Sequence, residues 1–493
     1  MRRSERWIAI VVALCAVVVT SVASDEHATL RPRDSWFVVS IGGTNCGWMH
    51  EKIEVLGDRI QTSNDTHLLL GRAGAATSVR MTWRFIETVD GAPMQCEVEQ
   101  ESGAEHSQTS YRFLPTGITV DETAGGHTLS RVMPRPEGTW WTPAAVERYA
   151  IARRRDGSAE MTYRTVDPTG GLKVIDIVSK RGGAGEGKTV RWTTTTSAVP
   201  MATEEDVDAD GDVIVSRTKM AIGDMVARRS SEAEAKKPSA GGGVDLITRT
   251  MVLLSKPSPE VLKGHRARLA VRSTNGEALS LPASGAQRFE ANPAGGLFVD
   301  VEVGRTSPVT AEELADARYL ASTILIDAND PAVKALAVRA VESAGLTNAS
   351  PVADRAEALR AFVMRFIVHK DLASAFAGAS AVAQSKAGDC SEHAVLLAAL
   401  LRAQGIPSRV ASGLIYAEEF GGKHNLFAWH MWTQAQVKGE WIDLDATLAS
   451  RPFHPGHLLI ATSAQDDAQL DSDFSNLLAT IGNLSIEVVH VDR

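Results

Sequence analysis

The sequence predicts an α+β protein, with a β-rich N-terminal sheet or sandwich module followed by a C-terminal α+β core. Over residues 34–305, apolar residues alternate between periodic turn signals, which is typical of strands in a meandering sheet or a sandwich. After Pro308 the apolar spacing becomes helical, and two strand-like runs follow the last predicted helix. With 493 residues, the chain is long enough for two or three domains.

Residues 1–23 have the composition of a targeting segment. A basic start precedes an apolar run from Ile8 to Ala23, and Ser21 and Ala23 are small enough for the −3 and −1 positions of a cleavage site. The run is short for a membrane-spanning helix, which needs about 20 residues. We therefore expect a cleaved signal peptide, with an uncleaved membrane anchor as the alternative. The protein is then exported, and is periplasmic, extracellular or tethered to a membrane through its N-terminus.

The charge of the chain argues against one class of partner. The formal net charge is −9, and it becomes −11 without residues 1–23, which contain three arginines and one glutamate. An acidic chain without basic stripes is a poor match for nucleic acid. We therefore expect no nucleic-acid partner.

Three cysteines remain outside the targeting segment. Cys46 and Cys96 lie in strand-like sequence, and in an oxidising compartment they could form a disulfide. They could equally be buried and free. Cys390 is the remaining thiol, and it is the one to examine for reactivity.

Two polar stretches interrupt the β-rich region. Residues 228–243, "RRSSEAEAKKPSAGGG", lack apolar periodicity, so we expect a flexible surface loop. In residues 206–212, "DVDADGD", Asp206, Asp208, Asp210 and Gly211 fit positions 1, 3, 5 and 6 of an EF-hand loop. Position 12, however, falls on Arg217, and no helices flank the stretch. A polar hairpin turn is the favoured interpretation, with calcium binding as the alternative.

The C-terminal region begins with a helix start signal. Thr310 and Glu313 have the spacing of a capping box. Helical apolar spacing continues over residues 331–345 and 352–370, and a further helix follows Cys390. Residues 408–417 and 428–447 then resemble strands, and the turn within the second run falls at Lys438-Gly439. We expect the core over residues 310–462, followed by a tail over 463–493.

Cys390 lies in the first turn of its predicted helix. Asp389 can cap the helix together with Glu392, and Gly405 and Pro407 end it. The positive end of the helix dipole favours a thiolate there, but the two acidic neighbours oppose it. A reactive thiolate therefore needs a cationic partner as well.

The predicted strands downstream offer that partner. His430 lies on the first strand of a predicted hairpin, and Asp443 and Asp445 lie on the second. A cysteine nucleophile, a histidine base and a carboxylate that orients the imidazole form a known catalytic set. The alternation of the strand does not choose between the two aspartates.

At this point the chain resembles the transglutaminase-like superfamily. The resemblance rests on "GDCSEHAVLLAALLRAQGIPSRVASG", "HMW" and "WIDLDAT", in that order. It implies that Cys390 is the nucleophile, His430 the base and Asp445 the orienting acid, because Asp445 has the family's D-x-T context. It also implies a papain-like fold, thioester chemistry on amides of proteins or peptides, and no cofactor. The β-rich region loosely resembles extensions that precede such cores in exported bacterial proteins.

Other residues are weaker candidates for the site. The backbone N–H of Cys390 is the natural oxyanion donor, and Gln384, six residues before Cys390, is a possible second one. Trp429 and Trp432 flank His430 and could line a substrate cleft. Four other histidines lie near these motifs: His393, His424, His454 and His457. We expect them in packing, surface or turn positions. Because they lack the paired spacing of metal ligands, we predict no metal site.

The favoured function is a cysteine-dependent amide hydrolase that resembles a protease. Papain-like thiol chemistry transfers the acyl group to water unless the site excludes water. The first alternative is protein-glutamine acyl transfer to an amine, which gives cross-links. The second is a non-catalytic scaffold that binds polypeptides.

Overall fold

The computed structural model describes residues 30–72, 75–103, 105–124, 127–220, 222–238, 244–245, 249–276, 278–323, 325–369, 377–449, 453–465 and 482–493. The predicted targeting segment, residues 1–23, lies outside these ranges. The chain divides into two compact units. Apart from residues 72–75, the N-terminal unit ends at Val244 and the C-terminal unit runs from Asp245 to Arg493.

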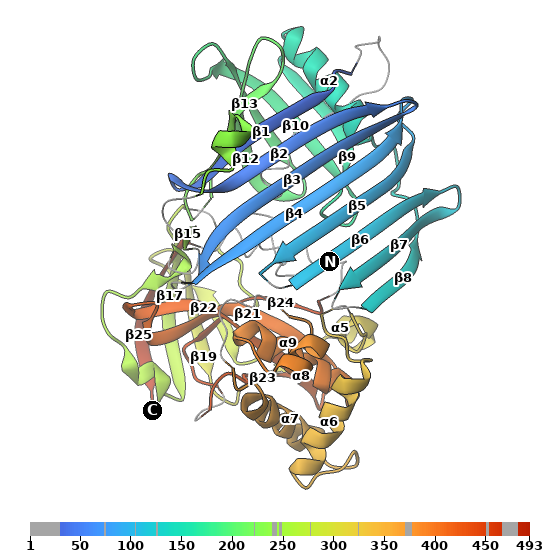
Figure 1. Cartoon of the computed structure of the whole chain (residues 1–493). Coiled ribbons are helices and arrows are strands. Elements are labelled where there is room, and N and C mark those ends of the chain that lie inside the picture. Colours follow the sequence, from blue (N-terminus) through green and yellow to red (C-terminus); the bar gives the residue numbers. More distant parts are fainter. Residues whose placement is uncertain are drawn as a thin grey trace. The chain divides into compact units, whose positions relative to one another are not determined.

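One meandering sheet forms most of the N-terminal unit (Figure 1). Its strands are β1 (Arg33–Ile41), β2 (Thr44–Leu56), β3 (Arg59–Arg72), β4 (Ala75–Thr88), β5 (Pro93–Ser102), β6 (Glu105–Leu114), β7 (Gly117–Ala124), β8 (His127–Met133), β9 (Glu160–Asp167), β10 (Lys173–Ala184), β11 (Val190–Thr196), β12 (Val199–Val207), β13 (Val213–Thr218) and β14 (Met225–Ser230), with β15 (Val244–Asp245) paired to β3. Strands β1–β8 and β9–β14 each follow sequence order, and β1 joins β14. The predicted β-rich N-terminal region is confirmed.

Helix α2 (Pro143–Arg155) packs against strands from both halves of this sheet. Its Ala144 is buried with residues of β2 and β3, whereas its Ala150 is buried with residues of β9 and β11–β13. Between them, Val146 packs on β9 and β10. The sheet must therefore curve around the helix.

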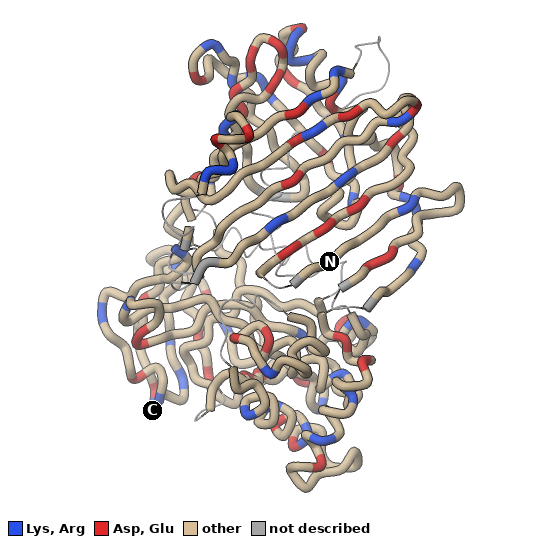
Figure 2. The backbone as a smooth tube through the Cα atoms, in the orientation of Figure 1, with Lys and Arg blue, Asp and Glu red and all other residues tan. Residues whose placement is uncertain are grey.

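Charged side chains follow the strands of the sheet. Figure 2 shows acidic and basic residues interspersed along them. Neighbouring strands pair these charges, as in Arg80 of β4 with Asp65 of β3 at 2.6 Å and Arg131 of β8 with Glu122 of β7 at 2.9 Å. The Arg80–Asp65 pair is partly exposed and therefore contributes little stability, whereas Glu122 is buried beneath Arg131.

A buried ionic cluster lies beside α2. Arg154 donates to Glu205 of β12 at 2.9 Å, and both side chains are 1% exposed. Arg33 donates to Glu147 of α2 and, at 3.2 Å, to Glu51 of β2. Burial raises the pKa of Glu51 to about 7, because the charge of Arg33 offsets burial only in part. Ion pairs therefore join α2 to the sheet. Removing one partner of a pair would leave the other partner as an unpaired buried charge.

Residues 228–238 do not form the predicted flexible loop. Residues 228–230 complete β14, where Arg228 and Arg229 lie opposite Val38 and Phe37 of β1. The following turn of helix, α3 (Glu232–Ala235), is capped by the Ser231 side chain. The prediction failed because arginines occupy the strand and hide its alternation; residues 239–243 lie outside the described ranges.

The acidic stretch over residues 206–212 is a hairpin turn between β12 and β13, as favoured from the sequence. The Asp208 carboxylate accepts hydrogen bonds from the backbone N–H groups of Asp210 and Asp212, at 2.9 and 3.0 Å. Asp206 is paired with Arg191 and Arg217 instead of facing the turn. Asp206 and Asp208 therefore already have donors, from arginines of β11 and β13 and from the backbone of the turn.

Cys46 and Cys96 are buried thiols that form no disulfide with each other, so the disulfide alternative is wrong. Cys46 lies on β2 and Cys96 on β5, with β3 and β4 between them. Strands lie about 4.8 Å apart, which separates the two by roughly 14 Å, whereas a disulfide needs Cα atoms within about 7 Å.

The C-terminal unit packs helices on a small antiparallel sheet (Figure 1). The sheet has the order β20 (Ser307–Pro308), β23 (Glu440–Leu444), β22 (Lys423–Val437), β21 (Ser408–Phe420) and β24 (His457–Ser463), with β16 (Val252–Leu253) paired to β22. The helical elements are η1 (Pro259–Leu262), α5 (Ala311–Ala315), η2 (Ala317–Tyr319), α6 (Pro331–Ser343), α7 (Val352–Phe366), α8 (Ala379–Ser385) and α9 (Cys390–Ala403). The predicted capping box of Thr310 and Glu313 begins α5. None of the helices in the described part of the chain is both long and apolar enough to cross a bilayer.

Helix α9 is the centre of this unit. Its residues from Ala394 to Leu401 are all buried, and α6, α7, α8, β21 and β22 contact it. A helix that is apolar on every side must be enclosed on every side. The position of its first residue, Cys390, is therefore fixed by the packing of the whole core.

The predicted boundary near residue 305 is wrong. A second sheet of the C-terminal unit has the order β18 (Gln287–Ala291), β19 (Leu297–Glu302), β17 (Arg266–Ser273) and β25 (Leu484–Asp492). It joins strands assigned to the β-rich region with a strand from the predicted tail. The Gln287 side chain also bonds to both backbone groups of Leu459 in β24, at 2.8 and 2.9 Å. The pairing spans about two hundred residues, so local patterns could not reveal it.

Arg409, in the Gly-Ile-Pro-x-Arg stretch, connects three parts of the C-terminal unit. Its guanidinium donates to Glu313 of α5 at 2.7 Å, to Ser284 at 2.8 Å and to Gln434 of β22 at 3.0 Å. It also stacks on the ring of Trp441, 3.8 Å from its centroid. Arg409 thus holds α5 and the Ser284 segment against strands β21 and β22.

Replacing Arg154 by Met should destabilise the N-terminal unit by about 3–5 kcal/mol, because Glu205 is left buried without its cation. Differential scanning calorimetry of the full chain measures this loss. The double variant Arg154→Met/Glu205→Leu should recover most of it, since no charge is then stranded. A double variant as unstable as the single one would contradict the ionic explanation.

Candidate active site

Cys390 is the first residue of α9 and is partly exposed. Asp389 caps the helix: its carboxylate accepts from the Ser391 N–H at 2.9 Å, and its own N–H donates to Glu392 at 2.8 Å. This is the reciprocal cap that the sequence predicted. The Cys390 N–H lies in the first turn, where helices lack internal acceptors, and so it remains the natural oxyanion donor.

Gly388 and Glu392 lie next to Cys390, and the structure shows why these two residue types occur there. Gly388 has φ +150°, and a Cβ there would lie 2.3 Å from the Glu392 Cβ, so only glycine fits. Glu392 is fully buried, and its second oxygen accepts from the Ala377 N–H at 2.9 Å. Helix α9 and the segment before α8 are thereby held together.

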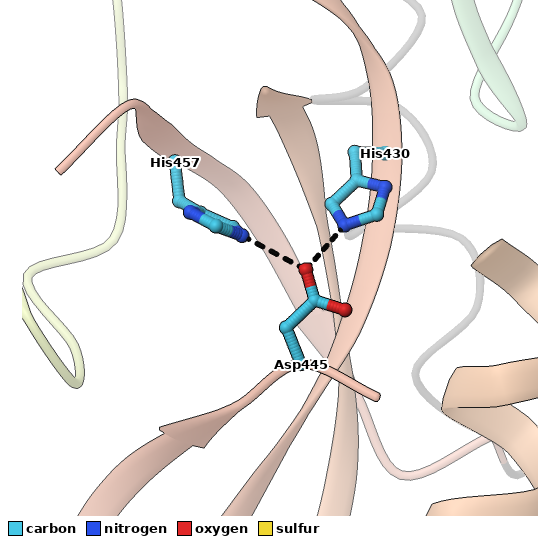
Figure 3. Close-up of side chains that lie close together, drawn as sticks. All are labelled: His430, Asp445 and His457. Atoms are coloured by element: carbon cyan, nitrogen blue, oxygen red, sulfur yellow. Dashed lines mark hydrogen bonds and ion pairs between the residues drawn. The ribbon is translucent and has the colours of Figure 1, made fainter. Parts of the chain in front are cut away.

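His430 and Asp445 form the second part of the site (Figure 3). His430 lies on β22, and its Nε2 donates to Asp445 Oδ2 at 2.7 Å; the side chains are 7% and 0% exposed. Cys390 lies close enough to His430 for its sulfur to help raise the pKa of the imidazole. Because Asp445 already holds Nε2, Nδ1 is the ring nitrogen left for sulfur. The structure thus brings Cys390, His430 and Asp445 together.

The electrostatics favour a charged imidazole. Burial by itself lowers the pKa of His430, but Asp445 and the Cys390 sulfur outweigh burial and raise it to about 10. Burial likewise acts to raise the pKa of Asp445, yet His430 and His457 hold it well below its ordinary value. At neutral pH the site therefore favours an imidazolium beside an ionised carboxylate.

The D-x-T context of Asp445 has a structural reason. Asp445 Oδ1 accepts from the Thr447 N–H at 2.7 Å and from its hydroxyl at 2.6 Å. Asp443, the other candidate, accepts instead from Trp432 Nε1, Gln434 and the Ala286 N–H. Only Asp445 reaches His430, whereas Asp443 serves the packing of the sheet.

Trp432 does not line an open cleft. It is 1% exposed, and its ring stacks beside His430 at a centroid distance of 6.1 Å. The prediction failed because β22 is covered on both faces. Trp429 is half-buried and packs against the α9 core, and its contact with a substrate stays a prediction.

His457 belongs to the site, although the sequence assigned it to a turn. It begins β24, is 0% exposed, and its Nε2 lies 3.0 Å from Asp445 Oδ2, the oxygen that His430 also uses (Figure 3). Its only sequence signal was the apolar run "LLIA" directly after it, which is typical of a buried strand. The pairing of β24 with β21 could not be read from that run.

The other sequence candidates lie apart from the triad or play packing roles. Gln384 is exposed near the end of α8, and its oxyanion role stays a prediction. His393 is buried within α9 and bonds to the Asp389 carbonyl at 2.5 Å, in agreement with packing. His454 is buried as well, whereas His424 is exposed near the start of β22.

Within the described ranges, His430, Asp445 and His457 offer three ligand atoms within 4.8 Å of one another, which is close enough for a metal ion. The two nitrogen-to-oxygen distances of 2.7 and 3.0 Å are ordinary hydrogen-bond lengths. We therefore interpret the cluster as hydrogen-bonded, and the absence of a metal stays a prediction.

Comparison with known proteins gives one family match. Residues 339–446 match the model of the transglutaminase-like superfamily. No curated protein matches the chain.

Three solved structures are similar to parts of the chain. A candidate cysteine protease from Cytophaga hutchinsonii is 16% identical over 46% of this chain and 90% of its own, with a TM-score of 0.28. A β-barrel-like protein of unknown function from Brucella abortus is 9% identical over 43% and 98%, with a TM-score of 0.31. A candidate protease from Parabacteroides distasonis is 11% identical over 78% and 70%, with a TM-score of 0.18. These TM-scores are too low to support conclusions about fold or function.

The family match runs from Arg339 in α6 to Ala446, directly after Asp445. It thus contains the nucleophile helix, the strand of His430 and the aspartate that His430 contacts. The C-terminal unit carries a transglutaminase-like domain.

Proposed function

We propose that the C-terminal unit is a thiol enzyme that hydrolyses amide bonds of peptides or proteins through a thioester on Cys390. One observation carries this proposal: His430 is hydrogen-bonded to the buried Asp445 carboxylate and is near enough to Cys390 for the sulfur to raise its pKa. A cysteine, an imidazole and a carboxylate in that order are the parts that nucleophilic catalysis on acyl groups requires.

The first half-reaction breaks the amide. The Cys390 thiolate attacks the carbonyl carbon, and the Cys390 N–H is placed to stabilise the oxygen that becomes negative. His430 then gives its Nδ1 proton to the leaving nitrogen, the C–N bond breaks, and an amine departs. A thioester remains on sulfur, and His430 is left neutral.

The second half-reaction releases the acid. Neutral His430 accepts a proton from water, the hydroxide oxygen attacks the thioester carbon, and the C–S bond breaks. This restores the thiolate and the imidazolium. Throughout both steps, Asp445 holds the Nε2–H of His430 and fixes the orientation of the ring.

Solvent access favours water as the acceptor. Cys390 is partly exposed, whereas His430 and Asp445 are buried behind it. Water can therefore reach the thioester, and hydrolysis is the default unless an amine competes. Transfer to an amine uses the same intermediate and would appear in the same assay.

We also propose that the protein is exported, on the strength of the targeting pattern in residues 1–23. Proteins or peptides outside the cytoplasm are then the substrates.

Replacing Cys390 by Ala should abolish turnover, and replacing Asp445 by Asn should lower it by about 10⁴-fold, because the imidazole loses its anionic partner. The assay incubates the full chain with casein peptides, with and without dansylcadaverine, and identifies products by mass spectrometry. Cleaved or deamidated peptides indicate hydrolysis, and dansylated peptides indicate transfer. Products that persist in the Cys390→Ala variant would exclude this cysteine as the nucleophile.

The raised pKa of His430 predicts the pH dependence of Cys390 reactivity. Because the folded protein favours the imidazolium until about pH 10, the thiolate has a cationic partner at pH 6. Alkylation of Cys390 by iodoacetamide at pH 6 should therefore be about tenfold or more faster than that of free cysteine, whose pKa is about 8.5. Quantitative mass spectrometry of the Cys390 peptide measures the rate. The His430→Gln variant should react at the free-cysteine rate, and equal rates in both proteins would argue against the ion pair.

A further inference from the structure

We propose that His457 is a positioning residue of this triad: it is a second, positively charged donor to Asp445 that holds the carboxylate and balances its charge while His430 gains and loses its proton. The inference rests on the proposed function, because both concern Asp445. It concerns a residue outside the Cys-His-Asp set, and it can be tested without any substrate.

The hydrogen bonds of His457 determine its protonation. Its Nδ1 lies 2.8 Å from the carbonyl oxygen of His454, which can only accept. Its Nε2 lies 3.0 Å from Asp445 Oδ2, and an ionised carboxylate also only accepts. Both ring nitrogens must therefore carry hydrogen, so that the ring is an imidazolium.

The neighbouring His454 has the opposite pattern. Its Nδ1 accepts from the Gly456 N–H at 3.1 Å, and a nitrogen that accepts carries no hydrogen. His454 is therefore neutral in this arrangement. The charged groups that face His457 are then Asp445 and His430, with the sulfur of Cys390 beyond His430. Two aromatic rings, Phe453 and Trp432, pack on His457.

Gly413 makes the meeting of the two histidines possible. His430 lies on β22 and His457 on β24, and β21 runs between these strands. Gly413 of β21 lies directly opposite His430, and a Cβ there would lie 1.9 Å from the Leu458 carbonyl oxygen and 3.1 Å from the Trp432 ring. Without a side chain at this position, rings from both outer strands can reach one carboxylate.

The charges show what His457 contributes to the reaction. In the resting pair, the Cys390 thiolate balances His430 and the Asp445 carboxylate balances His457. When His430 gives its proton to the leaving amine, Asp445 loses one cation but keeps the other. A buried carboxylate without a cation is costly, so His457 makes the proton transfer from His430 easier.

Metal binding is the main competing explanation of the same three residues. A metal would need Nε2 of His430 and of His457 without hydrogen, whereas both nitrogens lie at hydrogen-bond distance from one carboxylate oxygen. Zinc bound to the cluster would also separate His430 from its role toward Cys390. The two explanations therefore predict opposite effects of added zinc and of a chelator.

The test follows iodoacetamide alkylation of Cys390 across pH in the full chain. Loss of a positive charge raises the pKa of every nearby group, so the acid limb of the profile should move upward by about half a unit to one unit in His457→Gln. Gln keeps an N–H toward Asp445 but carries no charge. His457→Leu should show the same shift together with a lower maximal rate. The control His424→Gln, which changes an exposed histidine near the start of β22, should leave the profile unchanged.

Three outcomes would overturn the proposal. An unchanged acid limb in His457→Gln would assign His457 a packing role only. In the nitrogen-15 spectrum of histidine-labelled wild-type protein at pH 7, an unprotonated His457 nitrogen would exclude the imidazolium, and this reading does not need a folded variant. Zinc that copurifies in a one-to-one ratio and alters alkylation when chelated would assign the cluster to a metal. Failure of the amide assay with an intact His457 shift would reject the proposed reaction and leave the positioning role standing.

Discussion

The C-terminal unit is organised around one buried carboxylate. Asp445 is fully buried, and a carboxylate in that position is tolerated only if its oxygens are satisfied by donors and its charge by cations. Four donors meet it: the backbone and hydroxyl of Thr447 on Oδ1, and the rings of His430 and His457 on Oδ2. These donors come from β22, β24 and the segment after β23, so the sheet must keep its register for the carboxylate to remain ionised.

In the proposed mechanism, the reactivity of Cys390 depends on that carboxylate more than on its own helix. Asp389 and Glu392 occupy the N–H groups around the start of α9, namely those of Ser391, Asp389 and Ala377. The helix dipole is therefore shared with two acidic side chains, and the thiolate needs His430. His430 in turn keeps its charge because Asp445 raises its pKa to about 10 against the effect of burial. The order of dependence runs from His457 to Asp445, then to His430 and Cys390.

The sequence predicted the parts of this arrangement that are local. The caps of α5 and α9 depend on residues three apart, and the pair of His430 and Asp445 depends on one hairpin, so both were readable from spacing and motif. His457 was missed because it reaches the site through the pairing of β24 with β21, across Gly413. The same reason explains the wrong domain boundary, since β25 joins β17 from more than two hundred residues away. Residues 228–235 were misassigned because two consecutive arginines, Arg228 and Arg229, conceal the apolar alternation at the end of β14.

Two glycines show how closely the polar network constrains the chain. Gly388 allows the Glu392 side chain to fold back on the helix start, and Gly413 allows two imidazoles and an indole to meet above one strand. Each would place a Cβ within about 2.5 Å of an atom that holds the site, a distance at which the backbone itself must move. The geometry of the triad therefore depends on the lack of a side chain at Gly388 and Gly413 as well as on the three triad residues themselves. A change that left Cys390, His430 and Asp445 intact but added a methyl group at Gly413 would separate His457 from the carboxylate, because it closes the space through which the two strands share Asp445.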